Sequence, residues 1–308
     1  MTERMAATWA NTAERGAFAG LWLVATVYRL LGRRLAMALL APIVCYFYIT
    51  GKRQREASLA WLRRAKAHGA DVGEVTWWSG LKHQFVFAGG ALDRFSAWLG
   101  DIPPEKTVGL DDPEFQEVRA DRRGAVVLSA HLGVPEVMRA IATLGERRGV
   151  NILAHSANAA KFAEMMAKMA PKSSVRIIEV TDLGLAAAMT LAASMENGDW
   201  AVILADRIAP GGKSPSIWAP FLGQDAPFPA GPFILASALK CPVYTLFSVR
   251  QEGRYRVILR KFSERLDFPR KGREAALQGT VNRFAKELEE QALANPFQWF
   301  NFYDFWRL

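Results

Sequence analysis

The sequence lacks several patterns that would place it in a common class. It has only two cysteines, both in apolar runs, which argues against a disulfide framework or a cysteine-based zinc site and favours a reducing compartment. It has no P-loop and no dinucleotide-binding fingerprint. It also has no G-x-S-x-G element, so a serine hydrolase of the usual α/β type is not expected.

No apolar run reaches the roughly 20 residues that a helix needs to cross a bilayer. The strongest run, residues 35–50, contains Pro42 and has basic residues on both sides. We therefore predict an interfacial or re-entrant segment with both ends on the cytoplasmic face. A buried core hairpin and a single span are the alternatives. The N-terminus does not read as a signal peptide, because Glu3 and Glu14 interrupt it.

Positive charge is in excess: the sequence has 39 Lys and Arg and 30 Asp and Glu, a formal net charge of +9. Such a balance suits an anionic partner, which could be a membrane surface, a nucleic acid or an acidic carrier protein. The arginines are scattered and no nucleic-acid motif occurs, so nucleic acid is the least favoured of the three and is not expected as a partner.

The hydrophobic pattern divides the chain into two regions. Residues 1–104 read as helices, with a stop at Gly69 and a break at Gly89 and Gly90. Residues 105–308 alternate between strands and helices, which predicts βαβ units. The expected fold is α/β, with a mostly parallel central sheet flanked by helices and an N-terminal helical, membrane-associating layer in one integrated molecule.

Within the second region the pattern predicts individual elements. Strands are expected at 124–130, 150–156, 175–180 and 200–206, and an antiparallel hairpin at 242–250 and 254–262. Helices are expected at 135–148, 159–169, 184–196 and 231–240, and residues 205–230 read as a long loop. A C-terminal helix carries Leu277, Val281, Phe284 and Leu288 on one face.

A histidine and a glutamate stand where the first predicted strand ends, in "HLGVPE". His131 and Glu136 would lie about 140° apart on one helix, but Pro135 fits the first helical position and leaves His131 in the preceding loop. The loop can then fold the imidazole onto the carboxylate, giving a general base with an orienting group. On spacing alone, an idle loop histidine beside a helix-start glutamate is the alternative.

A second polar group follows the strand at 200–206. Asp206 and Arg207 stand at the strand end, where open α/β sheets place ligands. Gly211, Gly212 and Lys213 could present backbone amides and a cation to a phosphate. An ordinary surface connection is the alternative for this loop.

These motifs together resemble the lysophospholipid acyltransferase superfamily, in the bacterial branch that includes the lipid A late acyltransferases. The matching residues, in order, are His131 and Glu136 of a His-x4-Asp/Glu motif, then Asp206, Pro220, Phe221, Gly223, Pro229, Gly231, Pro242, Val243, Pro296 (offset by one), Gln298 and Trp299. The resemblance runs from about residue 15 to the end. The part before residue 100 is closer to a sister group of predicted acyltransferases of the aryl polyene or glycolipid type.

The resemblance implies an enzyme that moves a fatty acyl group from an acyl-carrier-protein or coenzyme A thioester to a hydroxyl of a lipid or glycolipid. It implies His131 as the base, Glu136 as its orienting group, and no metal or other cofactor. It also implies a peripheral or monotopic protein on the cytoplasmic face of the bacterial inner membrane. A non-catalytic lipid- or carrier-binding protein and an N-acyltransferase acting on an amine are the alternatives.

Further residues are candidates for substrate binding. Asp206, Arg207 and Lys213 follow from their place at a strand end, and the resemblance adds Asn158 and Lys161. Solvated helix starts are the alternative for the last two. The aromatic tail at 299–306 is expected to close the core; walling an acyl tunnel or lying at the membrane interface is the alternative.

Overall fold

The structure is a computed structural model. It describes residues 17–99, 102, 104–137, 149–154, 175–179, 185–208 and 215–307.

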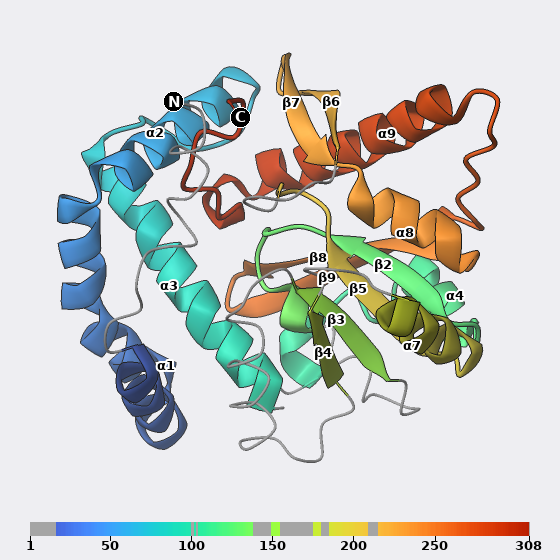
Figure 1. The fold of residues 1–308 in the computed structure, drawn as a ribbon. Coiled ribbons are helices and arrows are strands. Elements are labelled where there is room, and N and C mark those ends of the chain that lie inside the picture. Colours follow the sequence, from blue (N-terminus) through green and yellow to red (C-terminus); the bar gives the residue numbers. More distant parts are fainter. Residues whose placement is uncertain are drawn as a thin grey trace.

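Among residues 17–99, three helices form the N-terminal layer: α1 (Ala17–Thr50), α2 (Lys52–Ala67) and α3 (Trp77–Leu99). They stand together at one side of the molecule (Figure 1). Gly32 has non-helical angles (φ 79°), so α1 consists of two helical segments that meet there. Residues 35–50 are one of these segments, with many large apolar side chains exposed, so they do not form a buried core hairpin.

Helix α3 corrects one prediction, because it runs unbroken through Gly89 and Gly90. The two glycines serve packing instead of ending a helix. A Cβ on Gly89 would come within 2.5 Å of Arg33 Nη2, and a Cβ on Gly90 within 3.1 Å of the Phe300 ring. Their missing side chains let α1 and the C-terminal segment approach α3 closely.

In the described part of the chain, seven strands form the central sheet in the order β1-β9-β8-β2-β5-β3-β4. Their bounds are β1 Thr107–Val108, β2 Ala125–Ser129, β3 Val150–Ala154, β4 Val175–Glu179, β5 Trp200–Leu204, β8 Val243–Gln251 and β9 Arg254–Ser263. All neighbours pair in parallel except β8 and β9, which form the predicted antiparallel hairpin. The mostly parallel sheet is therefore confirmed, and short β1 is an addition that no pattern predicted.

The predicted loop at 205–230 contains a hairpin, β6 (Ser216–Phe221) and β7 (Gln224–Pro229). Its tight turn places Leu222 and Gly223 at positive φ. Prolines at 220, 227 and 229 cannot donate to a strand ladder, which is why the sequence resembles a loop. The hairpin forms its own two-stranded sheet and packs on α9 (Arg273–Ala294).

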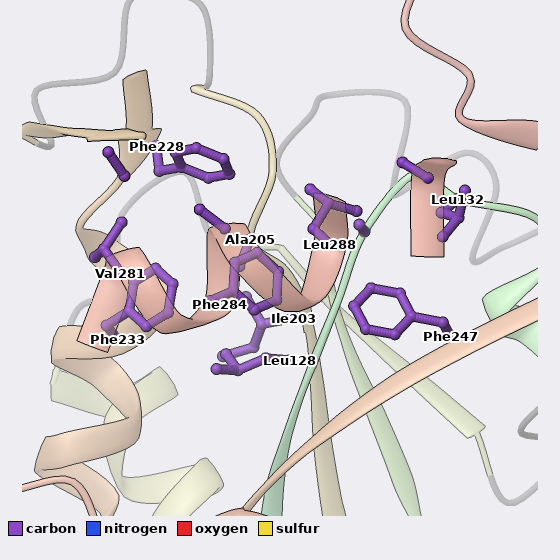
Figure 2. Packing of buried hydrophobic residues seen from close by; sticks show 14 of the residues in the cluster. Leu128, Leu132, Ile203, Ala205, Phe228, Phe233, Phe247, Val281, Phe284 and Leu288 are labelled. Carbon is purple, nitrogen blue, oxygen red and sulfur yellow. The ribbon is translucent and has the colours of Figure 1, made fainter. Parts of the chain in front are cut away.

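Each face of the sheet has its own core. On one face, α7 (Leu185–Glu196), α8 (Gly231–Leu239) and α9 pack with the β6–β7 hairpin over the strands. The predicted stripe of α9 is buried there, and Figure 2 shows Val281, Phe284 and Leu288 against Leu128 of β2 and Ile203 of β5. On the other face lie α4 (Pro113–Ala120) and the end of α3.

Two predicted helices fall largely or wholly outside the described residues. Of the helix expected at 135–148, the structure describes only its start, a single 3-10 turn at Pro135–Val137. The helix expected at 159–169 lies wholly outside the described part of the chain. Short 3-10 turns also occur at Pro104–Lys106 and Pro296–Gln298.

Candidate active site

Two neighbouring parallel strands bring His131 and Asp206 together. Strands β2 and β5 pair in register, with Ser129 opposite Leu204. Each strand is followed by an alanine and then by the polar residue, so His131 and Asp206 lie equally far beyond the sheet edge. Because this is the carboxyl edge of the parallel strands, it is the usual position for a ligand site.

Asp206 binds His131 at two points. One carboxylate oxygen lies 2.8 Å from His131 Nδ1, and the other accepts the backbone N–H of His131 at 3.0 Å. The Trp299 indole N–H donates to that second oxygen at 3.3 Å. The Asp206 side chain is 1% exposed while that of His131 is 24% exposed, so the imidazole faces the open side of the pair.

Electrostatics favour a neutral imidazole beside an ionised carboxylate. Burial lowers the pKa of His131, and the positive charge of Arg207 lowers it further, against the opposing effect of Asp206. Burial alone would raise the pKa of Asp206, but His131 and Arg207 bring it down to about 2. An ionised carboxylate only accepts hydrogen bonds, so Nδ1 carries the proton and Nε2 keeps its lone pair. This is the protonation state of a general base.

The structure places Glu136 differently from its predicted position. Glu136 Oε2 lies 3.4 Å from Arg94 Nε of helix α3, whereas His131 Nδ1 is held by Asp206. The carboxylate that fixes the imidazole tautomer is thus Asp206, which the sequence suggested only as a substrate contact. The reason is topological, since adjacent parallel strands set Asp206 beside His131 while the turn at Pro135 directs Glu136 toward α3.

The loop between His131 and Glu136 is pinned by backbone contacts. Gly133 N–H donates to the Gln298 carbonyl at 2.8 Å, and Phe300 N–H donates to the His131 carbonyl at 2.9 Å. Gly133 has φ 65°, and a Cβ there would come 1.9 Å from the Ser248 carbonyl oxygen. Only glycine fits this position without a shift of the backbone. The loop is therefore rigid at the point where the histidine is presented.

The remaining predicted site residues have mixed outcomes. Arg207 lies beside the pair, donates from Nη2 to the Phe300 carbonyl and stands 5.7 Å from the Tyr303 ring centroid. Asn158, Lys161 and Lys213 lie outside the described residues. Among the described residues, no group of three or more His, Cys, Asp or Glu side chains could hold a metal ion.

Trp299 links the site to the N-terminal layer. Its indole contacts Asp206, and its carbonyl lies 3.1 Å from His83 Nε2 of α3. The Trp61 ring of α2 packs edge-on against it, with ring centroids 4.5 Å apart. Ser58 completes the contact at His83 Nδ1, at 2.8 Å. The predicted core-closing role of the C-terminal tail is confirmed for Trp299, which is fully buried.

Sequence reasoning missed two pairings at the motif: Asp206 with His131, and Arg94 with Glu136. The His131–Asp206 pair had a signal, because "LSAH" and "ILAD" end their strands at the same offset. Arg94 had none, since it lies on a helix far from the motif in sequence and is one of many arginines.

Comparison with known proteins assigns the chain to a family. The profile of a family described as bacterial lipid A biosynthesis acyltransferase matches residues 105–308. Among curated proteins, none matches the chain. The matched segment covers about two thirds of the sequence and includes His131, Glu136 and Asp206. The chain belongs to the bacterial lipid A biosynthesis acyltransferase family and is an acyltransferase.

Proposed function

We propose that this acyltransferase moves a fatty acyl group from a thioester to a hydroxyl of a lipid or glycolipid, with His131 as general base. The observation that carries the proposal is the hydrogen bond between His131 Nδ1 and Asp206, at 2.8 Å. It leaves Nε2 on the exposed side with a free lone pair, so that Nε2 can take the proton of an acceptor hydroxyl.

The reaction then follows from that proton transfer. The acceptor oxygen attacks the thioester carbonyl carbon and forms a tetrahedral intermediate. The C–S bond breaks as the carbonyl re-forms, and the thiolate leaves and takes the proton from the His131 imidazolium. The ionised Asp206 stabilises the imidazolium while it exists. This series of steps needs no metal and no cofactor besides the acyl donor.

The donor is an acyl-carrier-protein or coenzyme A thioester. Both carry anionic groups, and the excess of positive charge favours either. The proposed contacts for an anionic group of donor or acceptor are Arg207, which lies close to the pair, and Lys213, which is nearby in sequence. Asn158 and Lys161 remain candidates for a polar contact.

Membrane attachment is proposed through α1. By length and composition, Thr26–Thr50 could cross a membrane, and only 11% of its apolar window is buried. The break at Gly32 leaves a segment of 18 residues that contains Pro42, about 27 Å long and slightly short of the ~30 Å hydrocarbon core. This length supports a helix lying in the interface, on the cytoplasmic face of the bacterial inner membrane.

The direct test is acyl transfer by the purified protein with a labelled acyl thioester and extracted lipid as acceptor. We expect His131→Ala to abolish acyl transfer without loss of folding. The control is His68→Ala, at an exposed histidine of the N-terminal helical layer, and it should retain acyl transfer. Near-normal transfer by His131→Ala would overturn the mechanism. Lipid mass spectrometry of a deletion strain would identify the acceptor and the acyl chain, and base-labile linkage would distinguish an ester from an amide.

A further inference from the structure

One residue that contacts the motif lies outside the family-matched segment. Arg94 belongs to α3, whereas the match begins at residue 105. Its Nε lies 3.4 Å from Glu136 Oε2, and its Nη2 donates to the Gly133 carbonyl at 3.4 Å. The guanidinium also lies 5.7 Å from the centroid of the Phe300 ring. One side chain thus touches the motif loop at two points, along with the segment that clamps it.

The Arg94–Glu136 contact is mainly one of charge. Arg94 Nε and Glu136 Oε2 are buried and have no hydrogen-bond partner among the described residues. The Glu136 side chain is 20% exposed, but its Oε2 is buried, and a buried carboxylate oxygen without a compensating charge is disfavoured. Removing Arg94 would therefore leave Glu136 Oε2 without its opposite charge, and the turn at Pro135–Val137 would have to shift to bring that oxygen to solvent.

Charged and titratable groups on several elements surround His131 and its loop. Asp206 and Arg207 come from the end of β5, Arg94 from α3, Glu136 from the turn after β2, and Tyr303 from the C-terminal tail beside Arg207. The positive charge of Arg94 also lowers the pKa of the His131 imidazole, after the larger effects of burial and of Arg207.

We propose that Arg94 is a positioning residue of the active site, which holds Glu136 and the His131–Glu136 loop in the reactive arrangement. The N-terminal helical layer thereby supplies part of the active site. The inference rests on the proposed function, in which His131 is the base.

The test measures kcat, KM and the pH profile of kcat/KM for Arg94→Ala and Arg94→Lys. We expect Arg94→Ala to lower kcat by about tenfold, with little change in KM, which corresponds to about 1.4 kcal/mol of transition-state stabilisation. Without the Arg94 charge the pKa of His131 rises, so the acidic limb of the profile moves to higher pH. Arg94→Lys keeps the positive charge, so the acidic limb of its profile should lie at the same pH as in the wild type.

Lys82 provides a matched control on the same helix. Its Nζ lies 4.1 Å from the centroid of the Phe297 ring, so it too is a cation held against the C-terminal segment, but it does not contact the motif loop. Lys82→Ala should leave kcat and the acidic limb unchanged. If Arg94→Ala behaves like Lys82→Ala, Arg94 is not a positioning residue.

Two further variants separate the inference from its premise. A double variant, Arg94→Ala with Glu136→Gln, should be no less active than the less active of the two single variants. If the two single losses in activation free energy add fully in the double variant, the inference is overturned. His131→Ala tests the premise independently: full activity there refutes the proposed function whatever Arg94 does. Should Arg94→Ala fail to fold, Arg94→Gln and Arg94→Lys carry the same comparison, and unchanged profiles in both would also refute it.

Discussion

At the scale of single residues, the site depends on which carboxylate holds the histidine. Asp206 is buried, accepts three hydrogen bonds from His131 and Trp299, and stays ionised down to a pKa of about 2. Glu136 belongs to the recognisable motif but faces Arg94. The motif thus marks the position of the site, while the imidazole is oriented by a residue 75 positions away.

Asp206→Asn should therefore damage catalysis severely. The Asn side chain can turn its NH2 toward Nδ1, which favours the imidazole tautomer that has no lone pair on Nε2. We expect kcat to fall by roughly 10³- to 10⁴-fold, the cost seen when an imidazole base loses its orienting carboxylate. The measurement is kcat for acyl transfer by folded, purified protein.

Asp199→Asn is the matched control for that prediction. Asp199 lies just before β5, at the other end of the strand, and its carboxylate also accepts a backbone N–H, from Gly149 at 2.9 Å. This change should leave kcat close to that of the wild type. Equal losses in the two variants would indicate damage to β5 in general and contradict the orienting role.

At the scale of elements, α3 connects the apolar helix α1 to the site. Gly89 and Gly90 admit Arg33 of α1 and Phe300 of the tail, Arg94 reaches the motif loop, and His83 supports the backbone of Trp299. His83 is fully buried, and burial lowers its pKa to about 4. A buried neutral histidine makes the stability of this helix packing depend on pH.

The sign of that dependence follows from proton binding. Below about pH 6.5 the unfolded chain protonates His83 while the folded chain does not, until the pH approaches 4. The free energy of unfolding should therefore decrease as the pH falls through this window, by about 3 kcal/mol in total for this group. Chemical denaturation between pH 7 and pH 4 measures the slope.

His83→Gln is the variant for this comparison. Glutamine does not titrate, and its amide can still donate to the Trp299 carbonyl and accept from Ser58. Its stability curve should be flatter than that of the wild type over the same window, whatever its stability at pH 7. His131 contributes a change of the same sign to both proteins, so the difference isolates His83. Parallel curves would show that His83 does not titrate in this way.

At the scale of the whole molecule, α1 presents one face to the protein and one to its surroundings. Val44 and Tyr48 pack against α3, whereas Leu35, Leu39 and Ile43 are 52%, 39% and 46% exposed. Trp77 and Trp78 at the start of α3 are also exposed. A row of exposed large apolar side chains with aromatic residues nearby is the surface expected at a membrane interface.

Replacing Leu35, Leu39 and Ile43 together by serine should weaken membrane binding. Burial of each side chain contributes on the order of 1.5–3 kcal/mol, so partial burial of three predicts at least a tenfold loss of partitioning. Cosedimentation with phosphatidylglycerol-containing vesicles measures it. Trp218→Ser, at an exposed aromatic residue of β6, should leave partitioning unchanged. Equal partitioning of the triple variant and the wild type would contradict the assignment.

Local pattern alone determined much of this protein. The alternation of apolar strands and helices predicted the parallel sheet, the β8–β9 hairpin and the buried stripe of α9, because burial on a sheet face imposes a period that can be read along the chain. It also located His131 and Asp206 at strand ends. Pattern failed at the β6–β7 hairpin, where prolines make strands resemble a loop, and at Gly89 and Gly90, where glycines serve contacts made by distant segments.

Only the tertiary structure decided which groups meet at the site. The pairing of β2 with β5 sets Asp206 on His131, and the packing of α3 against the loop sets Arg94 on Glu136. Strand order and helix placement depend on contacts between residues far apart in the chain, and a single sequence carries no local period for such contacts. The motif thus indicated the place and kind of chemistry, and the tertiary structure determined that His131 pairs with Asp206 and Glu136 with Arg94.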